Sequence, residues 1–281
     1  MYSWRKIREK LFTCIVTVFS LLAIAPIIHL IIVVSINGGM AMLKAGLNFF
    51  TDLPPTPYSK EIGGIAPAIV GTAIVTAISL PITISLALFA AIMTSEFPRN
   101  PISLTIDAVA RSLASIPTIA ISMIVYVLVV VPMNRFSALA GAIALAIVAM
   151  PYAYTYISTA LRSVPAVYRE AALSVAMSRW GTVLRVLIPI AGKSIVVGIL
   201  MTMARIMGET AALLFTVGRM RATVPFSPTE PVDAIPLLIF DYILSPYEIW
   251  HQVAWGATAF LLLAYVVIFL AVKLVVKEVR M

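Results

Sequence analysis

Six long apolar segments dominate the sequence, and they limit the possible folds more than any other feature. They cover about residues 11–36, 65–93, 106–131, 138–160, 190–217 and 252–276. A helix needs about 20 consecutive apolar residues to cross a bilayer. Within lipid, the chain must satisfy every backbone hydrogen bond internally, and a helix does so. The sequence therefore predicts an all-α polytopic membrane protein with six transmembrane helices.

Composition agrees with this prediction. Hydrophobic residues make up 62% of the 281 residues and charged residues 11%, whereas a soluble domain is about a quarter charged. Cys14 is the single cysteine, which excludes a disulfide framework and a cysteine metal site. The histidines, His29 and His251, are far apart and have no Cys or His cluster near them. We therefore expect no metal site.

The first apolar segment follows a basic start, as in a secretory signal peptide. Its length of about 26 residues exceeds the 7–15 or so of a signal peptide's apolar region. We therefore expect it to be a transmembrane helix. The net charge of +8 could indicate nucleic acid. Its positive residues are spread over the loops, without a basic stripe, so we expect lipid contact and no nucleic acid.

The positive residues orient the predicted spans, because cytoplasmic loops of membrane proteins are enriched in Lys and Arg. If both termini are cytoplasmic, thirteen Lys and Arg lie inside and five outside, with two more, Arg111 and Arg205, within spans. This bias predicts cytoplasmic termini. It also places the segment between the fourth and fifth spans in the cytoplasm. The two longest outer loops, 37–63 and 218–250, have room for short surface helices.

That cytoplasmic segment, at about 162–189, is polar and basic between two apolar spans. It contains Arg169, then Glu170-Ala171-Ala172, then Ala176, and it ends at Val186-Leu187-Ile188-Pro189. We expect Pro165 to Trp180 to form a short cytoplasmic helix that docks on a partner. Arg169 and Glu170 would anchor it, while Ala171, Ala172 and Val175 would seat it in a groove of a partner.

Two ion-pair spacings lie within predicted spans, where each ionisable residue costs about 2.5–3.5 kcal/mol on insertion scales. Arg205 and Glu209 are four residues apart, so a continuous helix would place them on one face. Gly208 lies nearby and lets another helix approach. Because arginine matches tetrahedral oxyanions well, this pair predicts an anion pathway. Asp107 and Arg111 repeat the spacing near a span end, where self-neutralisation is the simpler interpretation.

These residues also carry a family resemblance. The Glu170-Ala171-Ala172 segment, with Ala176 where the family usually has Gly and Pro189 at its end, resembles the coupling loop of ABC-importer permeases. The Ala in place of Gly leads us to expect a plain helical turn there. Residues 204–216 are similar to the fifth span of PstA-type phosphate-importer permeases, and Thr210 after Glu209 favours phosphate over sulfate or molybdate.

The resemblance implies a MetI-like permease core over residues 65–281, preceded by an N-terminal helix and outer loop over 1–64. It implies pairing with a second, PstC-like permease, two PstB-like ATPases and an outer PstS-like phosphate-binding protein. ATP and Mg would then bind the ATPase, so this chain is expected to need no cofactor and to catalyse no hydrolysis. Gly192-Lys193-Ser194 lacks the leading Gly and the strand of a nucleotide-binding loop.

The resemblance thus predicts a multi-pass subunit of the cytoplasmic or inner membrane that translocates phosphate. Its pathway residues would be Arg205, Gly208, Glu209, Thr210 and Arg111. Its ATPase-coupling residues would come from the loop: Arg169, Glu170, Ala171, Ala172, Ala176 and Pro189. Two alternatives remain open. One is a permease for another oxyanion. The other is an ion-coupled secondary anion transporter in which Glu209 carries a proton.

Overall fold

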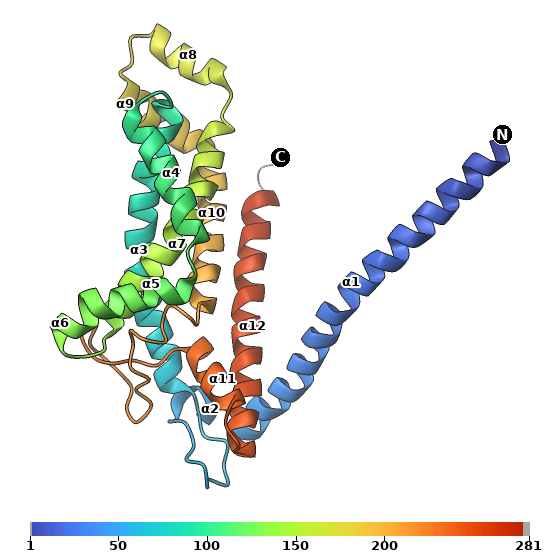
Figure 1. Ribbon diagram of the computed structural model, residues 1–281, viewed down its shortest axis with the longest axis vertical. Coiled ribbons are helices and arrows are strands. Elements are labelled where there is room, and N and C mark those ends of the chain that lie inside the picture. The colour runs from blue at the N-terminus through green and yellow to red at the C-terminus, as the bar shows by residue number, and fades with distance from the viewer. Residues whose placement is uncertain (1, 278–281) are drawn as a thin grey trace.

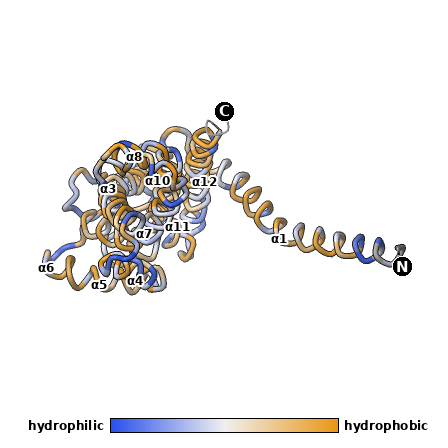
Figure 2. Tube along the Cα trace, turned by 90° about the horizontal axis from the view of Figure 1, so that it is seen from above, coloured by the Kyte–Doolittle hydropathy of each residue, from blue (hydrophilic) through white to orange (hydrophobic). Residues whose placement is uncertain are grey.

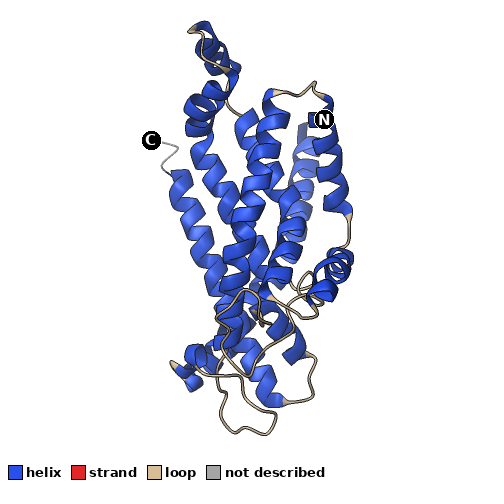
Figure 3. Ribbon diagram, turned by 90° about the vertical axis from the view of Figure 1, so that its left-hand side faces the viewer, coloured by secondary structure: helices blue, strands red, loops and turns tan. Residues whose placement is uncertain are grey.

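The protein is an all-helical bundle in the part of the chain that the computed structural model describes, residues 2–277. Figure 3 shows helices joined by loops, and the one β feature among these residues is an isolated bridge between Gly218 and Val232. The helices long and apolar enough to cross a membrane are α1 (Tyr2–Ala45), α3 (Ala66–Glu96), α7 (Ala138–Arg162), α10 (Ile188–Gly208) and α12 (Glu248–Lys277). They correspond to five of the six predicted spans.

The remaining predicted span, 106–131, is not one straight helix. It is divided into α4 (Pro101–Ser115) and α5 (Thr118–Val125), and α5 continues through a π-helical turn, η1 (Tyr126–Val130), into α6 (Val131–Met133). The two halves meet at 102°. Pro117 causes the break, because it lacks an N–H and drives the preceding residue, Ile116, out of the helical region. Ile116 accordingly has ψ 131°.

The fifth predicted span was wrong at both ends. The helix begins earlier than residue 190, with α9 (Arg179–Thr182) and the π-helical turn η2 (Val183–Leu187) leading into α10. It ends at Gly208 rather than at 217, and residues 211–216 form turns. The helix predicted from Pro165 to Trp180 is present as α8 (Ala166–Ser174), but it ends six residues earlier than predicted, because the chain turns at residues 175–178 before α9.

Each of the two long loops that were predicted to lie outside contains a short helix. The first holds α2 (Asn48–Thr51) and the second holds α11 (Ile235–Ile243). The chain between α10 and α11 packs back onto the bundle. There the Ile235 N–H donates to Thr72 Oγ1 on α3 at 2.9 Å, and Ser122 Oγ on α5 donates to the Ala212 carbonyl at 2.9 Å.

Helix α7 is the centre of the bundle. In its most apolar window 67% of the residues are buried, against 28% or less in the other four long helices. Its sequence is rich in alanine, which lets α3, α4, α5 and α10 approach closely. Ser137 fixes its start, because the hydroxyl accepts the Ala140 N–H at 3.1 Å. The helices that α7 contacts are therefore held in a defined arrangement.

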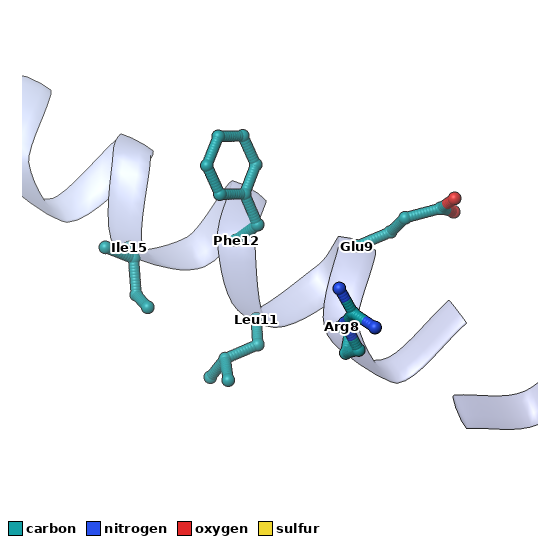
Figure 4. A pocket seen from close by; sticks show the side chains of 5 residues that line it. All are labelled: Arg8, Glu9, Leu11, Phe12 and Ile15. Carbon is teal, nitrogen blue, oxygen red and sulfur yellow. The ribbon is translucent and has the colours of Figure 1, made fainter. Parts of the chain in front are cut away.

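Helix α1 packs differently from the others. Figure 1 shows the end of α1 beside the start of α12 and the rest of α1 leaning away from the bundle. Its most apolar window has no buried residue, and Figure 2 shows that the projecting helix is largely hydrophobic. Figure 4 shows side chains that extend from one stretch of α1: Arg8, Glu9, Leu11, Phe12 and Ile15. These five side chains line a depression on the surface of α1. Because α1 alone contributes to it, the depression is not an enclosed binding site.

Candidate functional site: a docking helix and a mid-membrane arginine

Helix α8 lies outside the bundle, at the end where α1 begins and α12 ends (Figure 1). The predicted anchor Arg169 points back toward the bundle. Its Nε donates to the Glu96 carboxylate of α3 at 3.1 and 3.3 Å, and Nη2 donates to it at 3.0 Å. Nη1 and Nη2 also donate to the carbonyls of Val164 and Leu161 at 2.8 and 2.9 Å. Arg169 therefore anchors α8 to its own chain.

Glu170, the next residue, is exposed, and its side chain makes no hydrogen bond or ion pair among the described residues. Ala171 is also exposed, whereas Ala172 is buried at 6% exposure. The expectation that Ala172 seats in a partner's groove was therefore wrong, since its own chain covers it. The exposed large apolar side chains of residues 166–175 are Val167, Tyr168, Leu173 and Val175. These, with Glu170 and Ala171, form the surface available to a partner.

Ala176 does not sit in a plain helical turn, which corrects the prediction. Its φ is 59°, in the left-handed region that favours glycine. The Met177 N–H donates to the Ala172 carbonyl at 3.2 Å, and the Ala176 N–H donates to the Leu173 carbonyl at 3.0 Å. These two bonds form a Schellman motif that ends α8. The chain then turns sharply toward α9, whose start Ser178 caps by accepting the Gly181 N–H at 3.1 Å.

The rest of the predicted coupling segment is helical. Pro189 is the second residue of α10 and directly follows the π-helical turn η2. Gly192, Lys193 and Ser194 lie inside α10, not in a loop after a strand. A phosphate-binding nucleotide loop is therefore absent at this position, as the spacing indicated.

The second predicted site surrounds Arg205, in the last turn of α10. Its Nη2 lies 4.0 Å from Glu209 Oε2, so the two charges are paired. Glu209 lies just beyond the helix, with ψ 124°, not on a continuous helical face. The Arg205 guanidinium carbon lies 3.7 Å from the centroid of the Tyr152 ring on α7. Arg205 Nε is buried without a hydrogen-bond partner in the described part of the chain.

Gly208 fixes the depth of this site. A Cβ on Gly208 would overlap the hydroxyl of Tyr265, so α10 and α12 approach closely there. Tyr265 lies near the middle of α12, which places Arg205 and Glu209 about halfway along a membrane-spanning helix. Thr210 follows in the turn, partly exposed. The structure thus places Arg205, Gly208, Glu209 and Thr210 together where α10 ends.

Arg111 lies apart from this group, on α4. Its side chain is 80% exposed, and Nη2 is 3.7 Å from Asp107 Oδ2. Asp107 also accepts a hydrogen bond from the Tyr154 hydroxyl and lies 3.9 Å from Nη2 of Arg162. The carboxylate is thus shared by three donors from α4 and α7. This arrangement matches the self-neutralising interpretation, while leaving the Arg111 guanidinium largely accessible.

The sequence did not point to three residues that complete these sites: Glu96, Tyr152 and Tyr265. Glu96 stands at a span end, where a carboxylate usually faces water. Its place in the sequence therefore does not indicate that it pairs with Arg169. Both tyrosines lie inside apolar spans, where aromatic residues are ordinary packing residues. Only the contact between helices distant in sequence identifies them.

A bundle of membrane-length apolar helices, an amphipathic helix held outside it and an arginine at mid-depth define a membrane transport subunit. The chain belongs to the family of binding-protein-dependent transport system inner membrane components, whose sequence profile matches residues 83–281. It is therefore a multi-pass component of the inner membrane. Membership of this ABC transporter permease family implies an ATPase and a substrate-binding protein as partners.

Curated relatives carry a more specific name. The chain is 38% identical to the probable phosphate transport system permease protein PstA of Methanocaldococcus jannaschii, over 98% of this chain and 95% of that protein. It is 35% identical to a phosphate transport system permease protein PstA of Xylella fastidiosa, over 78% and 77%. For the PstA of Haemophilus influenzae the identity is 31%, over 93% and 91%.

Solved structures share the fold. A chain from an amino acid ABC transporter with histidines covers 86% of this chain and 98% of its own length, with a TM-score of 0.58 and 20% identity. A chain of the inward-facing MetNI methionine ABC transporter covers 76% and 91%, with a TM-score of 0.55 and 20% identity. The predicted MetI-like permease core is therefore confirmed as a fold.

Proposed function

We propose that this chain is the permease subunit of an ATP-driven importer that translocates inorganic phosphate across the cytoplasmic membrane. The relatives named as phosphate transport permeases support this substrate, since the first of them aligns over nearly the whole chain. No covalent chemistry is required of the chain. It provides one wall of a path, and the energy comes from ATP and Mg on a separate ATPase.

In the proposed topology, α8 and both helical ends of the described chain lie in the cytoplasm. The thirteen-to-five charge bias supports this orientation. The position of α8 at the same end as the start of α1 and the end of α12 is consistent with it (Figure 1). The exposed surface of α8 then faces the compartment that contains ATP.

The observation that carries the proposal is Arg205. A guanidinium halfway along a span is costly in lipid, and such residues mark pathways for ions and substrates. Its planar fork of N–H donors matches the oxygens of a phosphate group. The unpartnered Nε leaves part of this donor capacity unused. We infer that the phosphate path passes the end of α10 at this arginine.

The surroundings of Arg205 keep its attraction for an anion weak. Glu209 neutralises it from 4.0 Å, and the carboxyl end of α10 adds the partial negative charge of a helix terminus. A transport site must release its ion as well as admit it. Arg111, exposed on α4 nearer the cytoplasmic end, would act as a second cation on the way out.

The proposed assembly is a heterodimer with a PstC-like permease, on which two PstB-like ATPases and a PstS-like phosphate-binding protein act. The exposed face of α8 would meet an ATPase through Glu170 and the apolar side chains around it. The second permease would complete the path that this chain opens at Arg205. ATP-driven closure of the ATPases would then switch the bundle between two states.

Uptake of labelled phosphate into proteoliposomes tests the proposal, with all subunits, ATP and the binding protein present. Arg205→Gln should lower the initial uptake rate by about tenfold or more, the effect of losing a charge-assisted hydrogen bond, while the complex still assembles. Arg135→Gln, an exposed arginine in the turn before α7, is the matched control. Normal uptake by Arg205→Gln removes this residue from the path, and stimulation by a sulfate- or molybdate-binding protein instead would reassign the substrate.

A further inference from the structure

One side chain connects α8 to the bundle through hydrogen bonds. In the described range 2–277, Arg169 is the sole α8 side chain with a hydrogen bond to a residue outside α8. It reaches Glu96, the last residue of α3, the Leu161 carbonyl near the end of α7 and the Val164 carbonyl in the loop that follows. A guanidinium that holds three segments this way resists rotation, because its fork is planar and its bonds point in fixed directions.

The Glu96 carboxylate is itself fixed. The Ser95 hydroxyl donates to Oε1 at 2.9 Å, and the Glu96 side chain is only 12% exposed. Arg169 is 22% exposed. Both partners are thus mostly removed from water, where an ion pair is screened least. The pair also lies where α3 packs along α7, so a displacement of α8 would be passed to both helices.

The opposite end of α8 is built differently. There the chain leaves through the turn 175–178, in which Ala176 holds a left-handed conformation. The hydrogen bonds of this turn run back into α8 or forward into α9. None of the described α8 side chains hydrogen-bonds to α10. At this end α8 packs on α9 and η2 without a charged side-chain bond, whereas its other end holds a multidentate ion pair, so the two attachments of α8 are chemically unequal.

We infer that Arg169 and Glu96 form the link that transmits movement of α8 to α3 and α7, while the turn 175–178 is the hinge toward α10. This inference rests on the proposed function. Its consequence reaches the mid-membrane site, because Arg205 belongs to α10 and stacks on Tyr152 of α7. A movement that carries α7 with α8, but leaves α10 behind, changes the contact that holds Arg205.

Arg169 and Glu96 are thus positioning residues. Without either of them, the complex should hydrolyse ATP but transport less phosphate for each ATP. The measurement is phosphate taken up per ATP hydrolysed by the complete complex in proteoliposomes. Glu96→Gln should lower this ratio by about tenfold, since it removes a charge-assisted interaction, and should leave assembly intact. Arg169→Lys should give an intermediate value, because it keeps the charge without the fork. Glu248→Gln, at an exposed carboxylate that starts α12, is the control.

A covalent link distinguishes a transmitting pair from a merely stabilising one. In a Cys14→Ser background, Glu96→Cys with Arg169→Cys should show a low ratio that recovers when a flexible bifunctional thiol reagent joins them. Ser174→Cys with Arg179→Cys spans the hinge, and the same reagent should stop uptake. For each variant, transport after the reagent has joined the cysteines is compared with transport by the same variant before the reagent is added.

The inference is overturned if Glu96→Gln keeps the wild-type ratio, or if linking 96 to 169 blocks uptake. Linkage across 174 and 179 that leaves uptake unchanged also overturns it. Failure of the wild-type complex to transport phosphate would instead count against the proposed function, so the two can be told apart.

Discussion

The Arg205 guanidinium carbon lies 3.7 Å from the centre of the Tyr152 ring, which joins the end of α10 to the middle of α7. A cation over an aromatic face is stabilised by about 0.5–2 kcal/mol, more when water is excluded. The ring also holds the guanidinium beside Glu209. Tyr152 is therefore the residue that determines where the arginine points.

Replacing this ring should change transport in a way that depends on the aromatic face. Tyr152→Leu should lower the initial phosphate uptake rate by about fivefold, the equivalent of about 1 kcal/mol. Tyr152→Phe keeps the face and should stay near the wild-type rate. Uptake by proteoliposomes with equal amounts of assembled complex is the measurement. Equal loss in both variants would assign the effect to the hydroxyl.

The left-handed Ala176 should be improved by the residue that its conformation favours. Glycine has no Cβ to clash at φ 59°, so Ala176→Gly should stabilise the turn by about 1 kcal/mol. Limited proteolysis of the cytoplasmic segment should then be slower. Ala176→Val should act in the opposite direction, because a β-branched residue tolerates positive φ least. Faster cleavage of Ala176→Gly would show that chain entropy, not strain, controls this turn.

Apolar length and Pro117 explain how far the sequence alone could predict the fold. Runs of about 20 apolar residues must be helical in lipid, so the spans now seen as α3, α7 and α12 were predicted to within four residues at each end. Helix α1 extends nine residues beyond the predicted segment 11–36 at each end. Pro117 was visible, yet its effect depends on whether neighbouring helices can satisfy the freed carbonyls. Here they do not prevent a 102° bend. The sequence did not reveal that α10 ends at Gly208, because residues 209–217 are mostly apolar and read as a continuation of the span.

The residues of the candidate sites also fall into two groups, those that the sequence could identify and those that it could not. Arg205 and Glu209 could be identified because ionised groups are rare in spans. The inward direction of Arg169 and the burial of Ala172 could not, since α8 is short and polar on several sides. Which face is covered depends on Glu96, a residue 73 positions earlier in the chain. Contacts between residues so far apart in the chain leave no pattern in the local sequence.

Gly71 should tolerate no side chain. A Cβ on this residue of α3 would overlap the Asp233 carbonyl of the outer loop, and neither backbone can move without breaking its helix or the Thr72 hydrogen bond. Gly71→Ala should therefore destabilise the protein by about 1–3 kcal/mol. Gly192→Ala on α10 is the matched control, with no atom within 4 Å of its Cβ. It should stabilise the helix by about 1 kcal/mol.

Apparent melting temperatures of the detergent-solubilised protein compare the two glycine variants. The wild type should fall between them. If Gly71→Ala melts no lower than Gly192→Ala, the loop before α11 is not seated on α3 as the hydrogen bond from Ile235 to Thr72 indicates.

The outer loop contains a buried charge cluster whose stability should depend on pH. Asp233 is fully buried, and Arg221 bridges it to Asp241, with Nε 2.6 Å from Asp233 Oδ2 and Nη2 2.7 Å from Asp241 Oδ2. Arg219 Nε also lies 2.9 Å from Asp241 Oδ2. Burial raises the pKa of the Asp233 carboxyl above its usual 3.8, although Arg221 opposes the shift. Folding thus favours the protonated acid.

The raised pKa of Asp233 determines how the stability of the folded protein changes with pH. Below the usual pKa, Asp233 is protonated in both folded and unfolded chains and imposes no penalty. As the pH rises from 3.8 through the raised pKa of the folded state, the unfolded chain ionises first, and stability is lost. Asp233→Asn cannot ionise, and its Arg221 still pairs with Asp241. The variant should therefore gain in melting temperature relative to the wild type as the pH increases above about 4. A difference that stays constant between pH 4 and 7, or that falls, would mean that the Arg221 pair outweighs the cost of burying the carboxylate.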